Sequence, residues 1–240
     1  MKNYPWPLMM AWLTLFFFGA LSSAQADERE IRSMFETKFA KRGKVERIIK
    51  TPFAGLYEVV IGDQLIYSDE KGEYLFDGSV IDVKRGANIT EERHSELIAV
   101  DFDKLPLDLA MKKVKGAGKR KMAVFTDPNC PFCKGLEKEL AKVSDVTLYI
   151  FLYPIFPNSE QIVRNVQCAK DPVNAWDEWM TNGVAPAEAS CETSTEKVIG
   201  LGKKLRIKTT PNLIFASGKR APGYLSAEEM EKRFNEIGEN

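Results

Sequence analysis

Two cysteines in C-x-x-C spacing, Cys130 and Cys133, are the residues of this chain best suited to chemistry. An apolar run at residues 122–125 precedes them, and Leu136 and Leu140 follow at helical spacing. This order predicts a strand, a turn and then a helix that begins at the first cysteine. A thiol at a helix start lies beside unpaired backbone N–H groups and the positive end of the helix dipole, and both favour the thiolate.

The residue between strand and helix supports the same placement. Pro131 fits the first helical position, where its missing N–H costs nothing, so Cys130 caps the helix and Cys133 lies in its first turn. We therefore predict a redox-active dithiol, with Cys130 as an exposed nucleophile of lowered pKa and Cys133 as a buried resolving thiol.

Two other readings of the motif compete. A C-x-x-C pair is also half of a zinc site, and it can be one end of an inert disulfide. The other possible ligands are Cys168, Cys191 and the single histidine, His94, and the two cysteines are too far apart in sequence to form a knuckle. The predicted strand–turn–helix context favours the dithiol, and we expect no metal and no cofactor.

The N-terminus has the pattern of a secretory signal. Lys2 provides a weak positive region, residues 8–21 are almost wholly apolar, and Ala24-Gln25-Ala26 is an A-x-A cleavage site. The apolar run of about 14 residues is short for a membrane span of about 20. We predict a signal peptide at residues 1–26, and an uncleaved anchor is the alternative.

Charge and cysteine content narrow the class of protein. The chain has 240 residues with 34 basic and 34 acidic side chains, so it gives no electrostatic case for nucleic acid or an anionic membrane. Export implies an oxidising compartment, where cysteines pair. With C-x-x-C paired internally, Cys168 is left with Cys191, as a structural staple across two helices. The alternative for that pair is a second redox couple.

Residues 27–88 read as a small β-rich unit. A helix is predicted at residues 28–42, and short strands follow at residues 45–51, 56–61, 64–68, 73–76 and 80–83. A unit this small buries a thin core, and a second copy would cover its apolar strand faces. It is either a dimerisation module or a subdomain packed on its own chain.

A polar connection and a βα region follow. We predict a linking helix at residues 90–99 with the domain boundary near residues 88–105, and His94 there as ordinary surface. Residues 112–121 read as a basic surface loop. The remaining predicted elements are a strand at residues 122–126, a helix at 130–142, a central strand at 146–152 and mostly helix over 158–206.

Three features of the second half add detail. Trp176, Trp179 and Met180 are expected in the core. A proline before the apolar strand at residues 212–215 suggests a cis Thr210–Pro211 bond, which would expose backbone to pair with an extended substrate; a trans edge strand is the alternative. Ser226-Ala227-Glu228-Glu229 is a capping box that opens the last helix.

Together these residues resemble the thioredoxin superfamily, through Cys130-Pro131-Phe132-Cys133 and Thr210-Pro211. More closely, they resemble the DsbC/DsbG family of periplasmic disulfide isomerases. The additional carriers are Phe125-Thr126-Asp127, Cys168-Ala169-Lys170-Asp171, Cys191 and Pro222-Gly223-Tyr224. The resemblance implies an α+β fold: a cystatin-like dimerisation domain at 27–88, a linker helix at 89–105, and a thioredoxin-like catalytic domain with a helical insertion at 106–240.

The same resemblance implies a homodimeric periplasmic enzyme. It would isomerise or reduce non-native disulfides of exported proteins, bind them near Thr210 and Pro211, and take electrons from an inner-membrane thiol reductant of DsbD type. Pro131-Phe132 departs from the Gly-Tyr usual in DsbC and is closer to DsbG, and Val124 stands where thioredoxins carry a buried acid. The alternatives are a dithiol oxidase, a chaperone-type binder of unfolded chains and a folding factor for one partner.

Overall fold

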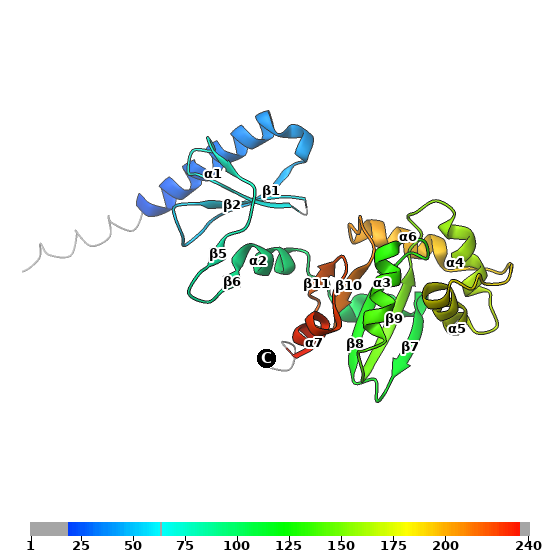
Figure 1. Cartoon of the computed structure of the whole chain (residues 1–240). Helices are drawn as coiled ribbons and strands as arrows, with labels where there is room; N and C mark the ends of the chain where they lie inside the picture. Colours follow the sequence, from blue (N-terminus) through cyan, green and yellow to red (C-terminus); the bar gives the residue numbers. More distant parts are fainter. Residues whose placement is uncertain (1–18, 63, 236–240) are drawn as a thin grey trace, which may run out of the picture. The chain divides into compact units, whose positions relative to one another are not determined.

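The computed structural model describes residues 19–62 and 64–235. They form two compact units, the first ending at His94 and the second beginning at Ser95 (Figure 1). Of the predicted signal peptide, residues 1–18 lie outside the described residues, and the next residues open the first helix. Within the two described ranges, no helix has the length and apolar character needed to cross a membrane.

The first unit pairs a long helix with a small antiparallel sheet. Strands β1 to β4 are neighbours in sequence order, β1-β2-β3-β4. The elements are α1 (Gly19–Lys38), η1 (Ala40–Arg42), β1 (Val45–Lys50), β2 (Tyr57–Ile61), β3 (Gln64–Ser68), β4 (Leu75–Phe76), β5 (Ile81–Asp82), β6 (Ala87–Asn88) and α2 (Ile89–Leu97). The predicted helix at residues 28–42 therefore ends four residues early, at Lys38, and a short 3-10 turn follows.

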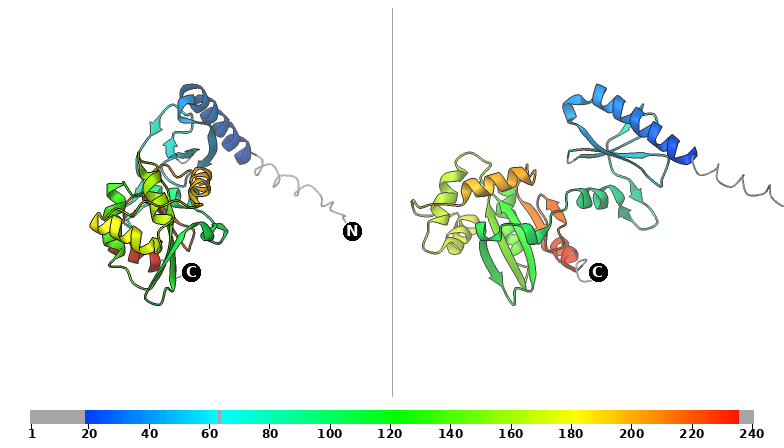
Figure 2. Two further views of the ribbon diagram at one scale, coloured as in Figure 1. Left: turned by 90° about the vertical axis from the view of Figure 1, so that its right-hand side faces the viewer. Right: turned by 180° about the vertical axis from the view of Figure 1, so that it is seen from behind.

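Both faces of this sheet are covered by the unit's own residues. On one face, Ile31 and Phe35 of α1 pack on Tyr57 and Val59 of β2, and α1 lies across the sheet in both views of Figure 2. On the other face, Arg93 of α2 makes a bidentate ion pair with the buried Glu58, with both N···O distances 3.0 Å.

The sequence left open whether this unit is a dimerisation module or a subdomain packed on its own chain, and dimerisation stays a prediction. Apart from Met34 on α1, the exposed large apolar side chains described in this unit lie on and beside its short strands. They include Tyr74 and Phe76 at β4 and Ile81 and Val83 at β5. What remains available for an interface is the region around these strands and the sheet edges at β1 and β4.

The second unit is built on a five-stranded sheet in the order β11-β10-β8-β9-β7. Strands β8 and β9 run parallel, and the other pairs are antiparallel. The elements are η2 (Phe102–Lys104), η3 (Leu107–Leu109), β7 (Met111–Lys115), β8 (Arg120–Thr126), α3 (Pro131–Leu140), β9 (Val146–Leu152), α4 (Ser159–Gln167), α5 (Pro172–Asp177), the π-helix η4 (Glu178–Asn182), α6 (Thr195–Lys204), β10 (Asn212–Phe215), β11 (Arg220–Pro222) and α7 (Ala227–Asn235).

Helices cover this sheet on both faces. Successive side chains of β8 therefore enter two different cores, one on each face. Met122 and Val124 face a core shared with α3, α4, α5 and α7. Ala123 and Phe125 face a second core shared with α6 and the 3-10 turns. The apolar run at residues 122–125 of β8 is typical of a sheet buried on both faces. This burial fixes the position of the strand end that leads to the two cysteines.

The prediction of a basic loop at residues 112–121 is wrong. Residues 111–115 form the edge strand β7, which pairs with β9, and residues 120 and 121 already belong to β8. Lys113 and Lys115 point to one face, where Lys113 pairs with Asp177 at 2.6 Å, while Lys112 is exposed. Lysines at alternate positions suit an edge strand, because they discourage pairing with another chain.

Other boundaries in the second unit follow local signals. Asp171 caps α5 by accepting a hydrogen bond from the Asn174 backbone N–H at 3.0 Å, and Gly183 ends η4 in a left-handed conformation. The predicted capping box is confirmed, since the Ser226 N–H donates to the Glu229 carboxylate at 2.7 Å. The predicted helical span 158–206 is interrupted, because no regular element covers residues 184–194.

Candidate active site

The two cysteines lie where the buried strand β8 turns into α3. Cys130 is the N-cap residue, with φ −78° and ψ 120°, and Pro131 occupies the first helical position. The Cys133 N–H donates to the Cys130 carbonyl at 3.1 Å, and the Lys134 N–H donates to the same carbonyl at 3.2 Å. Both thiols are free. The strand, turn and helix expected from the sequence are present.

Cys130 lies against a segment 80 residues further along the chain. Its Sγ donates a hydrogen bond to the Thr210 carbonyl at 3.3 Å, and the Thr210–Pro211 peptide bond is cis. The Thr210 Oγ1 is buried without a hydrogen-bond partner among the described residues. Pro211 leads into β10, which lies inside the sheet between β11 and β8, so the alternative of an edge strand is wrong.

The expectation that Cys130 is exposed is also wrong, because only 1% of the residue is accessible. Its sulfur lies against the Thr210 carbonyl, while the next two residues, Pro131 and Phe132, are exposed. Phe132 is 67% exposed.

Cys133 is fully buried at the start of α3, and its surroundings disfavour ionisation of the thiol. Burial raises the pKa of the Cys133 thiol to about 12, and the neighbouring Cys130 contributes in the same direction. Hydrogen bonds from the Asp127 backbone N–H and the Thr126 hydroxyl lower the pKa of Cys133, but they do not overcome burial. Cys133 is therefore held as a neutral thiol at neutral pH.

A buried carboxylate anchors the turn before Cys130. Asp127 is fully buried, and its Oδ1 accepts hydrogen bonds from the Asn129 N–H and the Ser159 hydroxyl, both at 2.7 Å. Its Oδ2 accepts from the backbone N–H groups of Ile155 and Phe156, at 2.7 Å and 3.0 Å. Four donors satisfy the charge, and the carboxylate joins the turn to the loop after β9.

Asp127 belongs to the Phe125-Thr126-Asp127 motif, but its role was not recognised from the sequence. The signal that could have been used is the Asp127-Pro128-Asn129 sequence, since an aspartate often accepts from the backbone two residues on. The partners at residues 155–159 carry no such signal, because they are distant in sequence.

Lys134 and Trp179 contact each other beside the dithiol. The Lys134 Nζ lies 4.6 Å from the centroid of the Trp179 ring. Trp179 was expected in the core with Trp176 and Met180. Those two are buried as predicted, but Trp179 is only half-buried, and its Nε1 donates to the Pro128 carbonyl at 2.9 Å.

The other two cysteines and the histidine lie apart from this constellation. Cys168 and Cys191 form a disulfide with a Cα–Cα distance of 5.7 Å. Cys168 caps the C-terminus of α4, but Cys191 belongs to the non-helical segment before α6, so the bridge does not join two helices as expected. His94 lies on α2. Within the described ranges, no group of three or more potential metal ligands occurs.

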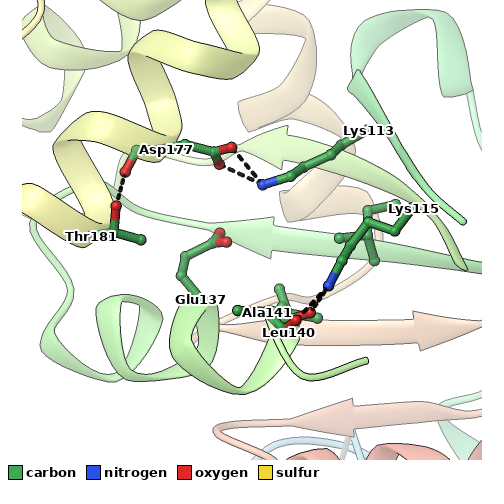
Figure 3. Close-up of a pocket in the computed structure, with 8 residues that line it drawn as sticks. Lys113, Lys115, Glu137, Leu140, Ala141, Asp177 and Thr181 are labelled. Carbon is green, nitrogen blue, oxygen red and sulfur yellow. Dashed lines mark hydrogen bonds and ion pairs between the residues drawn. The ribbon is translucent and has the colours of Figure 1, made fainter. Parts of the chain in front are cut away.

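A cavity of about 320 Å³ lies beside the C-terminal half of α3 and is lined by none of the predicted site residues (Figure 3). Glu137 extends into it between Asp177 and Lys115. Burial raises the pKa of Glu137, although a hydrogen bond from the Trp176 indole at 2.9 Å lowers it in part. Burial and the charge of Lys113 lower the pKa of Lys115, which donates to the Leu140 and Ala141 carbonyls.

Comparison with known families agrees with this architecture. Residues 22–91 match the model of the disulfide bond isomerase protein N-terminal domain, and residues 107–238 match a thioredoxin-like domain. A probable thiol:disulfide interchange protein DsbC of Bordetella parapertussis is 43% identical over 215 residues, which cover 88% of this chain and 76% of the relative. The chain belongs to the DsbC family.

More distant DsbC proteins also align over most of this chain. The thiol:disulfide interchange protein DsbC of Escherichia coli K12 is 28% identical over 222 residues, which cover 89% of each chain. A crystal structure of a disulfide interchange protein from Neisseria gonorrhoeae, 37% identical, superposes with a TM-score of 0.53 over 55% of this chain and 97% of its own. The predicted α+β fold, a thioredoxin-like domain after a small N-terminal domain, is confirmed.

Proposed function

We propose that this DsbC-family protein isomerises or reduces non-native disulfides in exported proteins through Cys130 and Cys133. The observation that carries the proposal is a free dithiol at the start of α3, beside the cis Thr210–Pro211 segment. The other two cysteines of the same chain are already paired. The DsbC relatives are named thiol:disulfide interchange proteins, which supports the same activity.

In the proposed first step, the Cys130 thiolate attacks one sulfur of a substrate disulfide. A Cys130–substrate mixed disulfide forms, and the other substrate sulfur leaves as a thiolate. In isomerisation, a substrate thiolate attacks a second bridge, and a later attack on the mixed disulfide expels the Cys130 thiolate. The substrate's disulfide number and the enzyme are then unchanged.

Reduction is the second outcome of the same intermediate. The Cys133 thiolate attacks the Cys130 sulfur, so the enzyme leaves as a disulfide and the substrate as a dithiol. Because burial holds the pKa of Cys133 at about 12, this attack is slow at neutral pH, which favours isomerisation over release. Two electrons from a DsbD-type inner-membrane thiol reductant would restore the dithiol.

Substrate contacts are proposed at two places. Thr210 and Pro211 would lie against the bound segment next to the Cys130 sulfur, since the Thr210 carbonyl already contacts that sulfur. The exposed ring of Phe132, together with the half-exposed Ile155 and Phe156, would meet apolar side chains of an unfolded chain. Such a surface also suits the chaperone-type binding considered from the sequence.

The proposed setting is the periplasm. Residues 1–26 would be removed as a signal peptide, residues 27–88 would form the dimerisation domain, residues 89–105 the linker and residues 106–240 the catalytic domain. The exposed Tyr74 and Phe76 at β4 are the apolar groups we expect a second copy to cover. Sedimentation of the mature chain against a Phe76→Lys variant tests the homodimer, because a lysine there should shift the chain to monomers.

A refolding assay tests the chemistry. The reduced mature protein is incubated with a scrambled multi-disulfide enzyme, and recovery of that enzyme's activity is followed against a small dithiol at equal thiol concentration. We expect recovery above the control, its loss in Cys130→Ser, and persistent mixed disulfides in Cys133→Ser. A Cys168→Ala/Cys191→Ala variant is the matched control, and it should keep the activity.

Two results would reject the proposal. Normal turnover by Cys130→Ser would show that the dithiol is not the catalytic group. Rapid oxidation of reduced substrate by the disulfide form, with no gain in the refolding assay, would identify an oxidase instead.

A further inference from the structure

Trp179 touches the chain on both sides of the dithiol. It lies on η4, in the helical insertion, and its indole Nε1 donates to the Pro128 carbonyl at 2.9 Å. Its ring carries the Lys134 Nζ at 4.6 Å from the centroid. Pro128 stands two residues before Cys130, and Lys134 stands one residue after Cys133. A single side chain of the insertion therefore contacts both ends of the active-site segment.

The hydrogen bond from the Trp179 indole gives the Pro128 carbonyl a partner that it would otherwise lack. Pro128 is buried, and a buried carbonyl without a partner is costly. The neighbouring groups of the turn are held by other partners. The Asp127 carbonyl accepts from the Cys130 N–H at 3.2 Å, and the Asp127 carboxylate accepts from the Asn129 N–H. Trp179 is thus the insertion's contribution to holding the turn that carries Cys130.

The Lys134 contact fixes the other end of the segment. The Lys134 backbone N–H donates to the Cys130 carbonyl at 3.2 Å, so its position depends on the cap of α3. Stacking the ammonium on an indole ring is favourable by itself and orients the side chain. Both contacts are present with the two thiols unpaired, and formation of a disulfide requires the two cysteines to adopt a different, narrowly defined geometry.

We propose that Trp179 is a positioning residue that holds the active-site turn in its dithiol geometry and so sets the balance between dithiol and disulfide. The proposal rests on the proposed role of Cys130 and Cys133. The exchange is balanced with glutathione: one enzyme dithiol and one oxidised glutathione give one enzyme disulfide and two reduced glutathione molecules. Loss of the indole N–H removes a bond that the dithiol form makes, and the equilibrium then moves toward the disulfide.

The test compares two tryptophan-to-phenylalanine variants of the full mature protein. Trp179→Phe keeps a ring under Lys134 and loses the bond to Pro128. Trp176→Phe loses an indole bond of the same length, 2.9 Å, made to Glu137 instead of to the turn. Each protein is equilibrated with glutathione buffers, trapped by acid and alkylation, and scored for dithiol by mass.

We expect Trp179→Phe to shift the equilibrium constant toward the disulfide by about two- to tenfold, the effect of one hydrogen bond. Trp176→Phe should stay within about twofold of the parent, although both variants lose stability. An unchanged constant in Trp179→Phe, or an equal shift in Trp176→Phe, would overturn the proposal. A parent protein without any Cys130-dependent equilibrium would instead reject the proposed function, and with it this inference.

A second measurement does not depend on the folding of a variant. The indole N–H of Trp179 in the parent protein is followed by nitrogen-15 NMR in both redox forms. We expect slow hydrogen exchange in the dithiol form and faster exchange in the disulfide form. Equal protection in the two forms would show that the bond does not distinguish them, and the inference would fail.

Discussion

Replacement of Asp127 by asparagine separates the charge of the buried carboxylate from its shape. In the parent protein the two oxygens accept four hydrogen bonds, from Asn129, Ser159, Ile155 and Phe156. An asparagine has the same size, but one of its oxygens becomes an NH₂ group that faces backbone N–H donors in either orientation. At least one bond is lost, and the others lose the strengthening that a charged acceptor gives.

The size of the effect follows from these bonds. A hydrogen bond to a charged group contributes about 1.5–3 kcal/mol, and a neutral acceptor about half of that. One bond lost and three weakened give a gross loss of about 4–7.5 kcal/mol, which is offset in part because the asparagine carries no buried charge to desolvate. We expect a net loss of about 3 kcal/mol in the free energy of unfolding.

Urea unfolding of the reduced protein measures this loss. Of the four tryptophans, only Trp176 and Trp179 remain when residues 1–26 are absent, and both lie in the second unit, so tryptophan fluorescence follows that unit alone. With an m-value of about 2 kcal/mol/M, the midpoint should fall by about 1.5 M.

The matched control for this substitution is Ser159→Ala, which removes only the hydroxyl donor to Asp127 and should lower the midpoint by less than 1 M, or about 1.5 kcal/mol. If Asp127→Asn cost no more than Ser159→Ala, the three backbone donors would not depend on the charge. The role assigned to the carboxylate in joining the two loops would then be refuted.

Three other substitutions test separate groups by the same unfolding assay. Burial raises the folded-state pKa of Glu137, so the charged carboxylate destabilises the parent once the pH is above about 4.5. Glu137→Gln should therefore become more stable than the parent as pH rises, by about 1.4 kcal/mol for each unit by which the pKa is raised. A gain in stability that does not depend on pH would contradict this. Thr210→Val should stabilise the protein by about 1 kcal/mol, since it removes a buried hydroxyl without a partner among the described residues, and a loss would show that the hydroxyl is bonded in solution. Replacing both Cys168 and Cys191 by alanine should lower the free energy of unfolding by about 3 kcal/mol, since the disulfide joins residues 23 positions apart. If a reductant did not change the unfolding of the parent protein, this stabilising role of the disulfide would be rejected.

The sequence predicted the parts of the site that depend on neighbours in the chain. The apolar run of β8, Pro131 at the first helical position and Cys130 at the cap are set by residues within about ten positions. The capping box at Ser226 and Glu229 was predictable for the same reason. Such signals act through local backbone geometry, which a sequence displays directly.

What the sequence could not predict depends on contacts between distant segments. The burial of Cys130 comes from Thr210, and the donors to Asp127 come from the loop after β9. The edge strand β7 was misread as a loop because alternating lysines resemble a solvated segment until the pairing with β9 is known. In each case the partner lies about 30 or more residues away, where no periodicity indicates the contact.

The burial of Cys133 affects the balance between isomerisation and reduction. With its pKa raised to about 12 by burial, Cys133 is a neutral thiol in nearly all molecules at neutral pH. Cys130 also raises the pKa of Cys133, through a hydrogen bond and a charge, and both disappear once Cys130 is joined to a substrate. Burial, the largest cause of the raised pKa, does not depend on them. Escape by reduction therefore waits on a rare deprotonation, and a substrate thiol has time to attack a second bridge first.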